Sequence, residues 1–213
     1  MGLPSPAQAA TITSTVSCVA SLGIGVAPTL RLAGTGFTPN APVVIRTSSP
    51  SKPSPKKLTT VTANPLGAFT TAVDPPAFNS ASTLDQSFKL LAVDTANPAT
   101  TASSTYRQVR FGFDARPSTG RPDRTVTYTA RGFLPGGGPV YAHFRFGGKT
   151  RRNVRIGAPS SPCGIASKRM RLLPTKTRFG TWTIYMDQSP VYRRDTALQA
   201  QGSLTITRTL TGG

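Results

Sequence analysis

The residues that could do chemistry in this 213-residue chain are few and scattered. His143 is the single histidine, the acids are seven Asp with no Glu, and the cysteines are Cys18 and Cys163. A metal site would need ligands from remote segments, and no spacing typical of zinc ligands occurs. A Ser-His-Asp arrangement lacks the Gly-x-Ser-x-Gly turn that exposes a nucleophile. The sequence therefore predicts a non-enzymatic protein with no cofactor and no metal.

Positive charge is the dominant chemical feature, because 25 Lys and Arg against seven acids give a net charge of +18. The excess is uneven: residues 1–107 carry a net +4 and residues 108–213 a net +14. Such a charge attracts polyanions. The candidate partners are an anionic cell-wall polymer, an acidic protein surface, and nucleic acid. Nucleic acid would bind without sequence specificity, because no nucleic-acid motif occurs.

Alternation along the expected strands assigns the basic side chains to faces. In residues 140–146 and 181–187 one alternate set is apolar, so the other set is expected to face outward. If residues 151–156 join the same sheet, its outer face combines Arg forks for phosphate or carboxylate with Tyr rings for stacking. The predicted polyanion-binding residues are Tyr141, His143, Arg145, Arg151, Arg155, Arg169, Arg171 and Tyr185. The alternative is a solvated basic face that favours solubility.

An internal repeat with a period of about 96 residues indicates the domain organisation. Residues 30–45 read LRLAGTGFTPNAPVVI, and residues 126–142 read VTYTARGFLPGGGPVYA. Each has an alternating strand, Gly-Phe-x-Pro, a short turn, and a second strand that begins Pro-Val. A second matching pair is Leu90 to Asp94 and Thr183 to Asp187, each an apolar strand that ends at Asp.

Each repeat offers about seven short strands with turn signals between them, which predicts two tandem immunoglobulin-like β-sandwich domains and an all-β fold. We expect a signal-like or disordered tail at residues 1–10, domain 1 at 11–107 and the strongly basic domain 2 at 108–213. Middle hairpins are expected at residues 58–73 and 150–173, and a Pro-rich loop at residues 52–57. Trp182 is expected in the core of domain 2.

The cysteines and the N-terminus bear on the cellular compartment. The two cysteines fall in different repeats, which excludes the internal bridge of antibody-type domains. Two buried free thiols are expected, and a long-range bridge between the domains is the alternative. Ala7-Gln8-Ala9 fits the pattern of a signal-peptidase site, although the charged and apolar regions that should precede it are absent. The start is therefore expected to be truncated or misassigned, with the signal upstream.

The Gly-Thr-Gly-Phe-x-Pro turn followed by Pro-Val-Val-Ile resembles bacterial surface immunoglobulin-like domains of the IPT/TIG type. The second half resembles the C-terminal regions of secreted actinobacterial proteins. These resemblances cover most of the chain, rest on structural turns, and imply export with a binding or envelope role and no catalytic residues. We expect a secreted or cell-surface module that holds an anionic envelope polymer through domain 2. The alternatives are a structural component of a virus particle or filament, such as a phage decoration or fibre protein, and a non-specific nucleic-acid binder.

Overall fold

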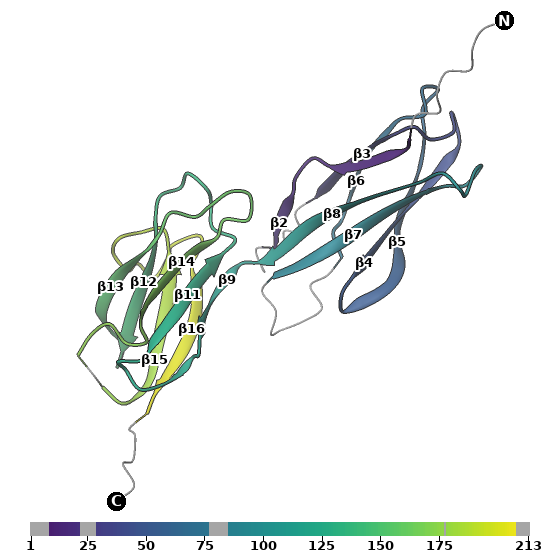
Figure 1. The fold of residues 1–213 in the computed structure, drawn as a ribbon. Coiled ribbons are helices and arrows are strands. Elements are labelled where there is room, and N and C mark those ends of the chain that lie inside the picture. Colours follow the sequence, from purple (N-terminus) through teal and green to yellow (C-terminus); the bar gives the residue numbers. More distant parts are fainter. Residues whose placement is uncertain (1–8, 22–28, 77–84, 177, 208–213) are drawn as a thin grey trace, which may run out of the picture. The chain divides into compact units, whose positions relative to one another are not determined.

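The structure is a computed structural model that describes residues 9–21, 29–76, 85–176 and 178–207. Every regular element in these residues is a β-strand. The chain divides into two compact units, Met1–Val19 with Gly25–Gln108 and Ala20–Ile24 with Val109–Gly213, called domain 1 and domain 2 below. Each pairs two β-sheets around its own hydrophobic core (Figure 1). The predicted all-β fold of two tandem immunoglobulin-like sandwiches is confirmed.

Domain 1 packs a three-stranded sheet on a five-stranded one. The smaller sheet has the order β1-β3-β6, made of β1 (Thr11–Ser14), β3 (Leu30–Thr35) and β6 (Phe69–Val73). The larger has the order β2-β8-β7-β4-β5, made of β2 (Cys18–Ser21), β8 (Thr101–Arg110), β7 (Asp85–Asp94), β4 (Pro42–Ser49) and β5 (Lys52–Thr62). Alternate residues of facing strands fill the core, among them Leu30, Leu32, Val43, Ile45 and Leu90.

Domain 2 repeats this arrangement. Its three-stranded sheet has the order β14-β11-β9, made of β14 (Ala166–Arg171), β11 (Thr125–Arg131) and β9 (Gly112–Arg116). Its five-stranded sheet has the order β10-β16-β15-β12-β13, made of β10 (Thr119–Gly120), β16 (Ala200–Ile206), β15 (Gly180–Asp187), β12 (Val140–Phe146) and β13 (Lys149–Gly157). Trp182 is fully buried, as predicted, and its indole N–H donates to the carbonyl of Arg178 at 2.9 Å.

The Gly-Phe turns that marked the repeat have the same anchor in both domains. The Phe37 N–H donates to the Gly67 carbonyl at 3.0 Å, and the Phe133 N–H donates to the Gly164 carbonyl at 3.2 Å. Both accepting glycines have a positive φ, and a Cβ added to either would lie within 2.2 Å of the phenylalanine carbonyl oxygen. Only glycine fits such an approach, because it has no Cβ and tolerates positive φ.

The predicted middle hairpins are wrong, because each joins two different sheets. In domain 1, β5 belongs to the five-stranded sheet and β6 to the three-stranded sheet; in domain 2 the same holds for β13 and β14. The loop predicted at residues 52–57 is also wrong, since β5 begins at Lys52. Pro53 and Pro55 are tolerated there because β5 is the edge strand, where a missing backbone N–H need not break a ladder.

Neither cysteine is a free thiol. Cys18 starts β2, Cys163 precedes β14, and both are buried and disulfide-bonded. The prediction of two free thiols is therefore wrong. Separation along a chain constrains pairing only weakly, because the entropic cost of closing a loop rises by about 0.6 kcal/mol for each doubling of its length.

The turn anchor predicts a large difference between two glycines of domain 2. Gly148 and Gly164 both have a positive φ, but a Cβ at Gly148 meets nothing within 4 Å. We expect Gly148→Ala to lower the free energy of unfolding by about 1 kcal/mol, the cost of the backbone conformation. Gly164→Ala should cost at least about 3 kcal/mol, because the Phe133 carbonyl must also move. Thermal unfolding of both variants checks this, and equal losses would contradict the anchor.

The disulfide state predicts the outcome of a thiol assay. Titration of the unfolded chain without reductant should detect no thiol, and titration after reduction should detect two per chain, because the sequence contains two cysteines. Two thiols before reduction would contradict the structure.

Candidate functional site

The predicted outward-facing residues of β12 and β15 lie in rows across the five-stranded sheet of domain 2. Tyr141 stands between Arg155 on β13 and Asp187 on β15, and His143 stands between Asn153 and Tyr185. The residues between them on β12, Val140, Ala142 and Phe144, are fully buried in the core. The predicted faces are therefore correct. The structure also brings Tyr141, His143, Arg145, Arg151, Arg155 and Tyr185 together on one sheet, as predicted.

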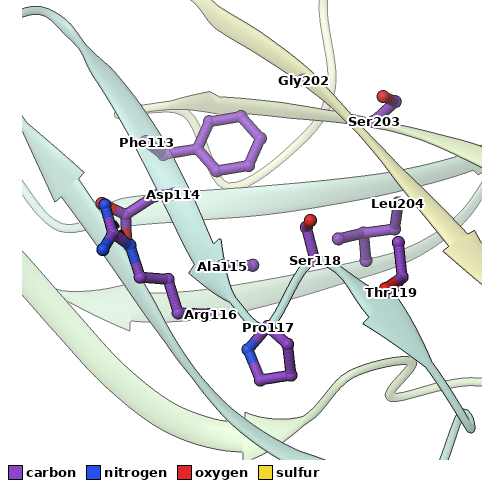
Figure 2. A pocket seen from close by; sticks show the side chains of 10 residues that line it. All are labelled: Phe113, Asp114, Ala115, Arg116, Pro117, Ser118, Thr119, Gly202, Ser203 and Leu204. Atoms are coloured by element: carbon purple, nitrogen blue, oxygen red, sulfur yellow. Dashed lines mark ion pairs between the residues drawn. The ribbon is translucent and has the colours of Figure 1, made fainter. Parts of the chain in front are cut away.

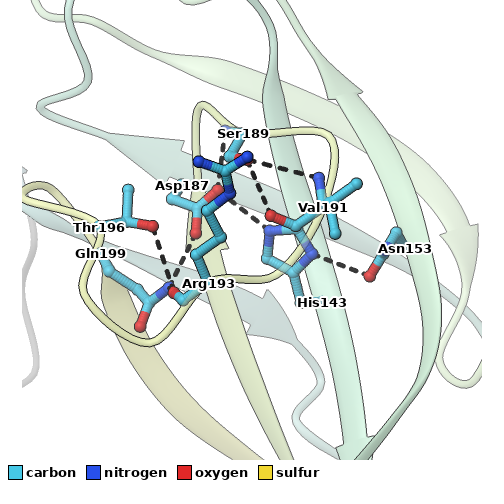
Figure 3. Close-up of polar contacts among 8 residues, drawn as sticks. All are labelled: His143, Asn153, Asp187, Ser189, Val191, Arg193, Thr196 and Gln199. Carbon is cyan, nitrogen blue, oxygen red and sulfur yellow. Dashed lines mark hydrogen bonds and ion pairs between the residues drawn. The ribbon is translucent and has the colours of Figure 1, made fainter.

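Solvent exposure of His143 was predicted and is wrong. The side chains of His143 and Asp187 are both 0% exposed although they lie on the outer face. Residues 188–199, which connect β15 to β16, fold back over this face, as Figure 3 shows. We call this connection the strap. Sequence alternation identifies the face of a residue, but it does not show that a later loop covers that face.

The two nitrogens of His143 both have partners. Nε2 lies 3.0 Å from Asp187 Oδ1, and Nδ1 lies 2.9 Å from Asn153 Oδ1. Because a carboxylate can only accept, Nε2 carries a proton. The Asn153 amide can turn either its oxygen or its nitrogen toward Nδ1, so it can serve a neutral or a protonated ring. His143 is thus a buried bridge between strands, and both nitrogens are already used.

Asp187 fastens the strap to the sheet. Besides His143, it accepts from the Ser189 N–H at 2.8 Å and from Gln199 Nε2 at 2.8 Å, so both ends of the strap bind one carboxylate (Figure 3). Burial raises the pKa of Asp187, but the hydrogen bonds from His143, Gln199 and Ser189 outweigh it, and the pKa is lowered. The folded domain therefore favours the ionised carboxylate.

Tyr192 holds the middle of the strap against the sheet. Its ring lies 5.1 Å from Tyr185 and 5.7 Å from His143, between centroids. The Arg145 guanidinium carbon lies 4.2 Å from the Tyr192 centroid, and Arg145 Nη1 donates to the Tyr192 hydroxyl at 2.8 Å. Arg145 and Tyr185 are half-buried in these contacts. Neither presents the free guanidinium or open ring face that polyanion binding was predicted to use.

A one-residue register difference between the domains places Asp187 in this network. In domain 1, Val43 pairs with Asp94. Val140 corresponds to Val43 in domain 2, but the next residue, Tyr141, is the one that pairs with Asp187. Gln188, rather than Asp187, therefore takes the place of Asp94. The hydrogen bonds agree: Thr38 N–H donates to Asp94 at 2.6 Å, and Leu134 N–H donates to Gln188 at 3.2 Å.

The four remaining arginines lie on two different sheets. Arg151 and Arg155 are on β13, an edge strand of the five-stranded sheet, and Arg169 and Arg171 are on β14, an edge strand of the three-stranded sheet. All four are exposed. These edges adjoin each other, since Lys168 Nζ on β14 donates to the Arg155 carbonyl at 2.8 Å. The arginines thus gather along one side of the sandwich rather than on one outer face.

A broad open groove of about 740 Å³ lies in domain 2 between β9 and β16, where the chain crosses from one sheet to the other (Figure 2). The Phe113 ring packs on Gly202, where a Cβ would come within 2.7 Å of the ring. Three hydroxyls, those of Ser118, Thr119 and Ser203, line the groove. Its carboxylate, Asp114, is held by Arg131 at 2.7 Å. The carboxylate of the lining is thus already paired with a cation.

No group of three or more His, Cys, Asp or Glu that could hold a metal occurs in the described residues. The described residues also contain no apolar helix of the length needed to span a membrane.

The chain is similar in structure to several solved proteins. No protein-family model and no curated protein matches the sequence, so the IPT/TIG resemblance remains a hypothesis. A tetra-tandem repeat from the extending region of a large adhesion protein matches 93% of this chain with 15% identity and a TM-score of 0.32. This chain covers 49% of that repeat segment. A two-domain fibronectin type-III segment of chicken tenascin matches 91% of this chain and 97% of its own length, with 10% identity and a TM-score of 0.30. The E. coli chaperone DraB matches 94% of this chain and 98% of its own length, with 8% identity and a TM-score of 0.33.

The strap predicts how stability depends on pH. Asp187→Asn should lower the free energy of unfolding at neutral pH by about 2 kcal/mol, because charge-assisted hydrogen bonds are lost. Since the folded pKa is lowered, the carboxylate stabilises the fold above its ordinary pKa of 3.8 and loses this effect as the pH falls through the folded pKa. The gap between wild type and variant should therefore shrink below pH 3.8.

Denaturant unfolding at several pH values measures this gap. Asp195→Asn is the matched control, because Asp195 lies exposed on the same strap. A constant gap from neutral to acid pH would rule out the assigned role of the Asp187 carboxylate.

Proposed function

We propose that the protein is a secreted or cell-surface, non-enzymatic binding module that holds an anionic envelope polymer along one side of domain 2. The binding surface, called the basic edge, consists of seven cations on β13 and β14: Lys149, Arg151, Arg152, Arg155, Lys168, Arg169 and Arg171. The single observation that carries the proposal is that these two adjoining edge strands bear seven cations and no acid.

The cations of the basic edge are available to a ligand. All seven side chains are exposed, and none forms an ion pair with another described residue. Asp123 interacts only weakly with Arg171: the pKa of Asp123 is lowered mainly by its hydrogen bond from Arg121 and to a smaller extent by Arg171. A polyanion would therefore displace water and counterions rather than protein carboxylates.

The spacing suits an extended polymer. Alternate residues on a strand lie about 6.6 Å apart, so Arg169 and Arg171 can meet successive charges of one chain. Arg151 and Arg155 are exposed on the edge strand of the opposite sheet, so a polymer that contacts both pairs passes around the side of the sandwich. Guanidinium groups bind phosphate or carboxylate through paired N–H donors.

An envelope polymer fits these residues better than nucleic acid does. Proteins that bind single strands combine cations with open aromatic rings on which bases stack. β13 and β14 contain no aromatic residue, and the nearby Tyr185 is packed under Tyr192. The disulfide state supports an oxidising compartment, because disulfides persist mainly in secreted and surface proteins.

The proposal predicts the behaviour of a fourfold variant of the full chain. Changing Arg151, Arg155, Arg169 and Arg171 to Gln should weaken binding to poly(glycerol phosphate) at low salt by at least about tenfold, because contacts that release counterions are lost. Stability should change little, since exposed substitutions usually cost within about 0.5 kcal/mol each.

The control variant changes Arg31, Arg46, Lys57 and Lys89 to Gln. These residues are exposed in domain 1 and remove the same charge. It should weaken binding less than about threefold. Equal weakening by the two variants would show that net charge alone attracts the polymer. Markedly tighter binding of single-stranded DNA of equal charge would favour the nucleic-acid alternative.

A further inference from the structure

The inner face of the five-stranded sheet in domain 1 changes character along β4. Val43 and Ile45 belong to the hydrophobic core, but the next inward positions, Thr47 and Ser49, are polar and still buried. The opposite strands β1, β3 and β6 have four to six residues, whereas β5, β7 and β8 have 10 or 11. At about 3.3 Å per residue, the smaller sheet cannot cover the full length of the larger one.

A cavity of about 160 Å³ lies at this end of the larger sheet, between β4, β5 and β7. Its polar lining includes Thr47, Ser49, Ser54, Lys52 and Lys56, and its apolar wall is formed by Phe88 and Pro76. The side chains at 52, 54 and 56 reach it because alternate residues of a strand share a face. Lys57, which pairs with Arg46, is not part of the lining.

Thr47 is the unusual residue of this cavity. Its side chain is 4% exposed, yet its hydroxyl makes no hydrogen bond with the described residues. The Tyr106 hydroxyl lies near it and is buried without a hydrogen bond of ordinary geometry as well. Burial raises the pKa of Tyr106 to about 12, and its polar contact with the Thr47 side chain lowers it. The two oxygens do not reach hydrogen-bond geometry. A buried polar group without a partner destabilises the fold, so such a group needs an explanation.

The charged side chains that line the cavity are all positive. Lys52 and Lys56 lie at its rim, no acid lines it, and neither lysine has an ion-pair partner in the part of the chain that the structure describes. Phe88, which stacks on Tyr106 at 5.4 Å between centroids, gives the wall a rigid aromatic surface. The combination is a buried hydroxyl, two ammonium groups and an aromatic wall.

We propose that this cavity binds one anionic sugar residue, such as a uronic acid. The carboxylate lies between Lys52 and Lys56, a ring hydroxyl bonds with Thr47, and the apolar face of the ring packs on Phe88. The volume corresponds to about five waters, which exceeds a bare oxyanion and limits the ligand to about one sugar ring. The site is independent of the basic edge, because it lies in the other domain.

The test is an NMR titration of the ¹⁵N-labelled full chain with glucuronate. A monosaccharide of this size is expected to bind with a Kd on the order of 1 mM. The backbone amides of Thr47, Ser49 and Lys56 should shift. Glucose, which lacks the charge, and inorganic phosphate, which lacks the ring, should bind at least about tenfold more weakly.

Two variants separate the site from general attraction. Lys56→Gln should weaken glucuronate binding at least about fivefold, and Lys57→Gln, which removes the same charge from the neighbouring position, should change it less than about twofold. Thr47→Val should also weaken binding, but the unfolding midpoint should stay equal or rise, because an unpartnered buried hydroxyl is removed.

Several outcomes would overturn the proposal. Equal weakening by the two lysine variants would reduce the effect to net charge, and equal binding of phosphate would reduce the ligand to a simple anion. A loss of stability in Thr47→Val would show that the hydroxyl has a structural partner. The fourfold variant of the basic edge should bind glucuronate as the wild type does, even where it no longer binds the polymer. The two proposals can therefore fail independently.

Discussion

Both sandwiches depend on the contact between a phenylalanine backbone and a glycine. The N–H of Phe37 or Phe133 donates to the carbonyl of Gly67 or Gly164, and the glycine stands too close to the phenylalanine carbonyl for any side chain. This contact joins the turn before the second core strand to the connection between the two sheets. Because both phenylalanine rings are buried, the turn, the sheet crossing and the core are fixed together.

Domain 2 differs from domain 1 through a small change at the end of one strand. Gln188 takes over the turn contact that Asp94 makes in domain 1, which leaves Asp187 on the outer face. An unpaired carboxylate there would be solvated, but the strap of residues 188–199 covers it and supplies Ser189 and Gln199 as donors. The strap therefore covers the face on which ligand binding was predicted, whereas the cations of β13 and β14 are exposed.

Sequence periodicity correctly predicted features that depend on neighbouring residues, such as the two faces of a strand. It missed features that depend on contacts between segments far apart in the sequence. Alternation correctly placed Trp182 and Phe144 in the core, because the faces of a strand follow from its pleat. It could not show that a strap covers His143, since nothing in residues 188–199 signals where that segment lies. The cavity at Thr47 was missed for a related reason: it depends on a difference in length between sheets whose pairing is not local.

The charge of the basic edge disfavours strand pairing between copies of the protein. β13 and β14 are edge strands, and a free edge is a template on which the sheet of a second molecule can extend. Four cations on β13 make such an approach repulsive between identical molecules. Under the proposed function, an anionic polymer that neutralises these charges would remove the repulsion along the occupied strand. Side-by-side alignment of polymer-bound molecules would then depend on the ionic state of this one strand.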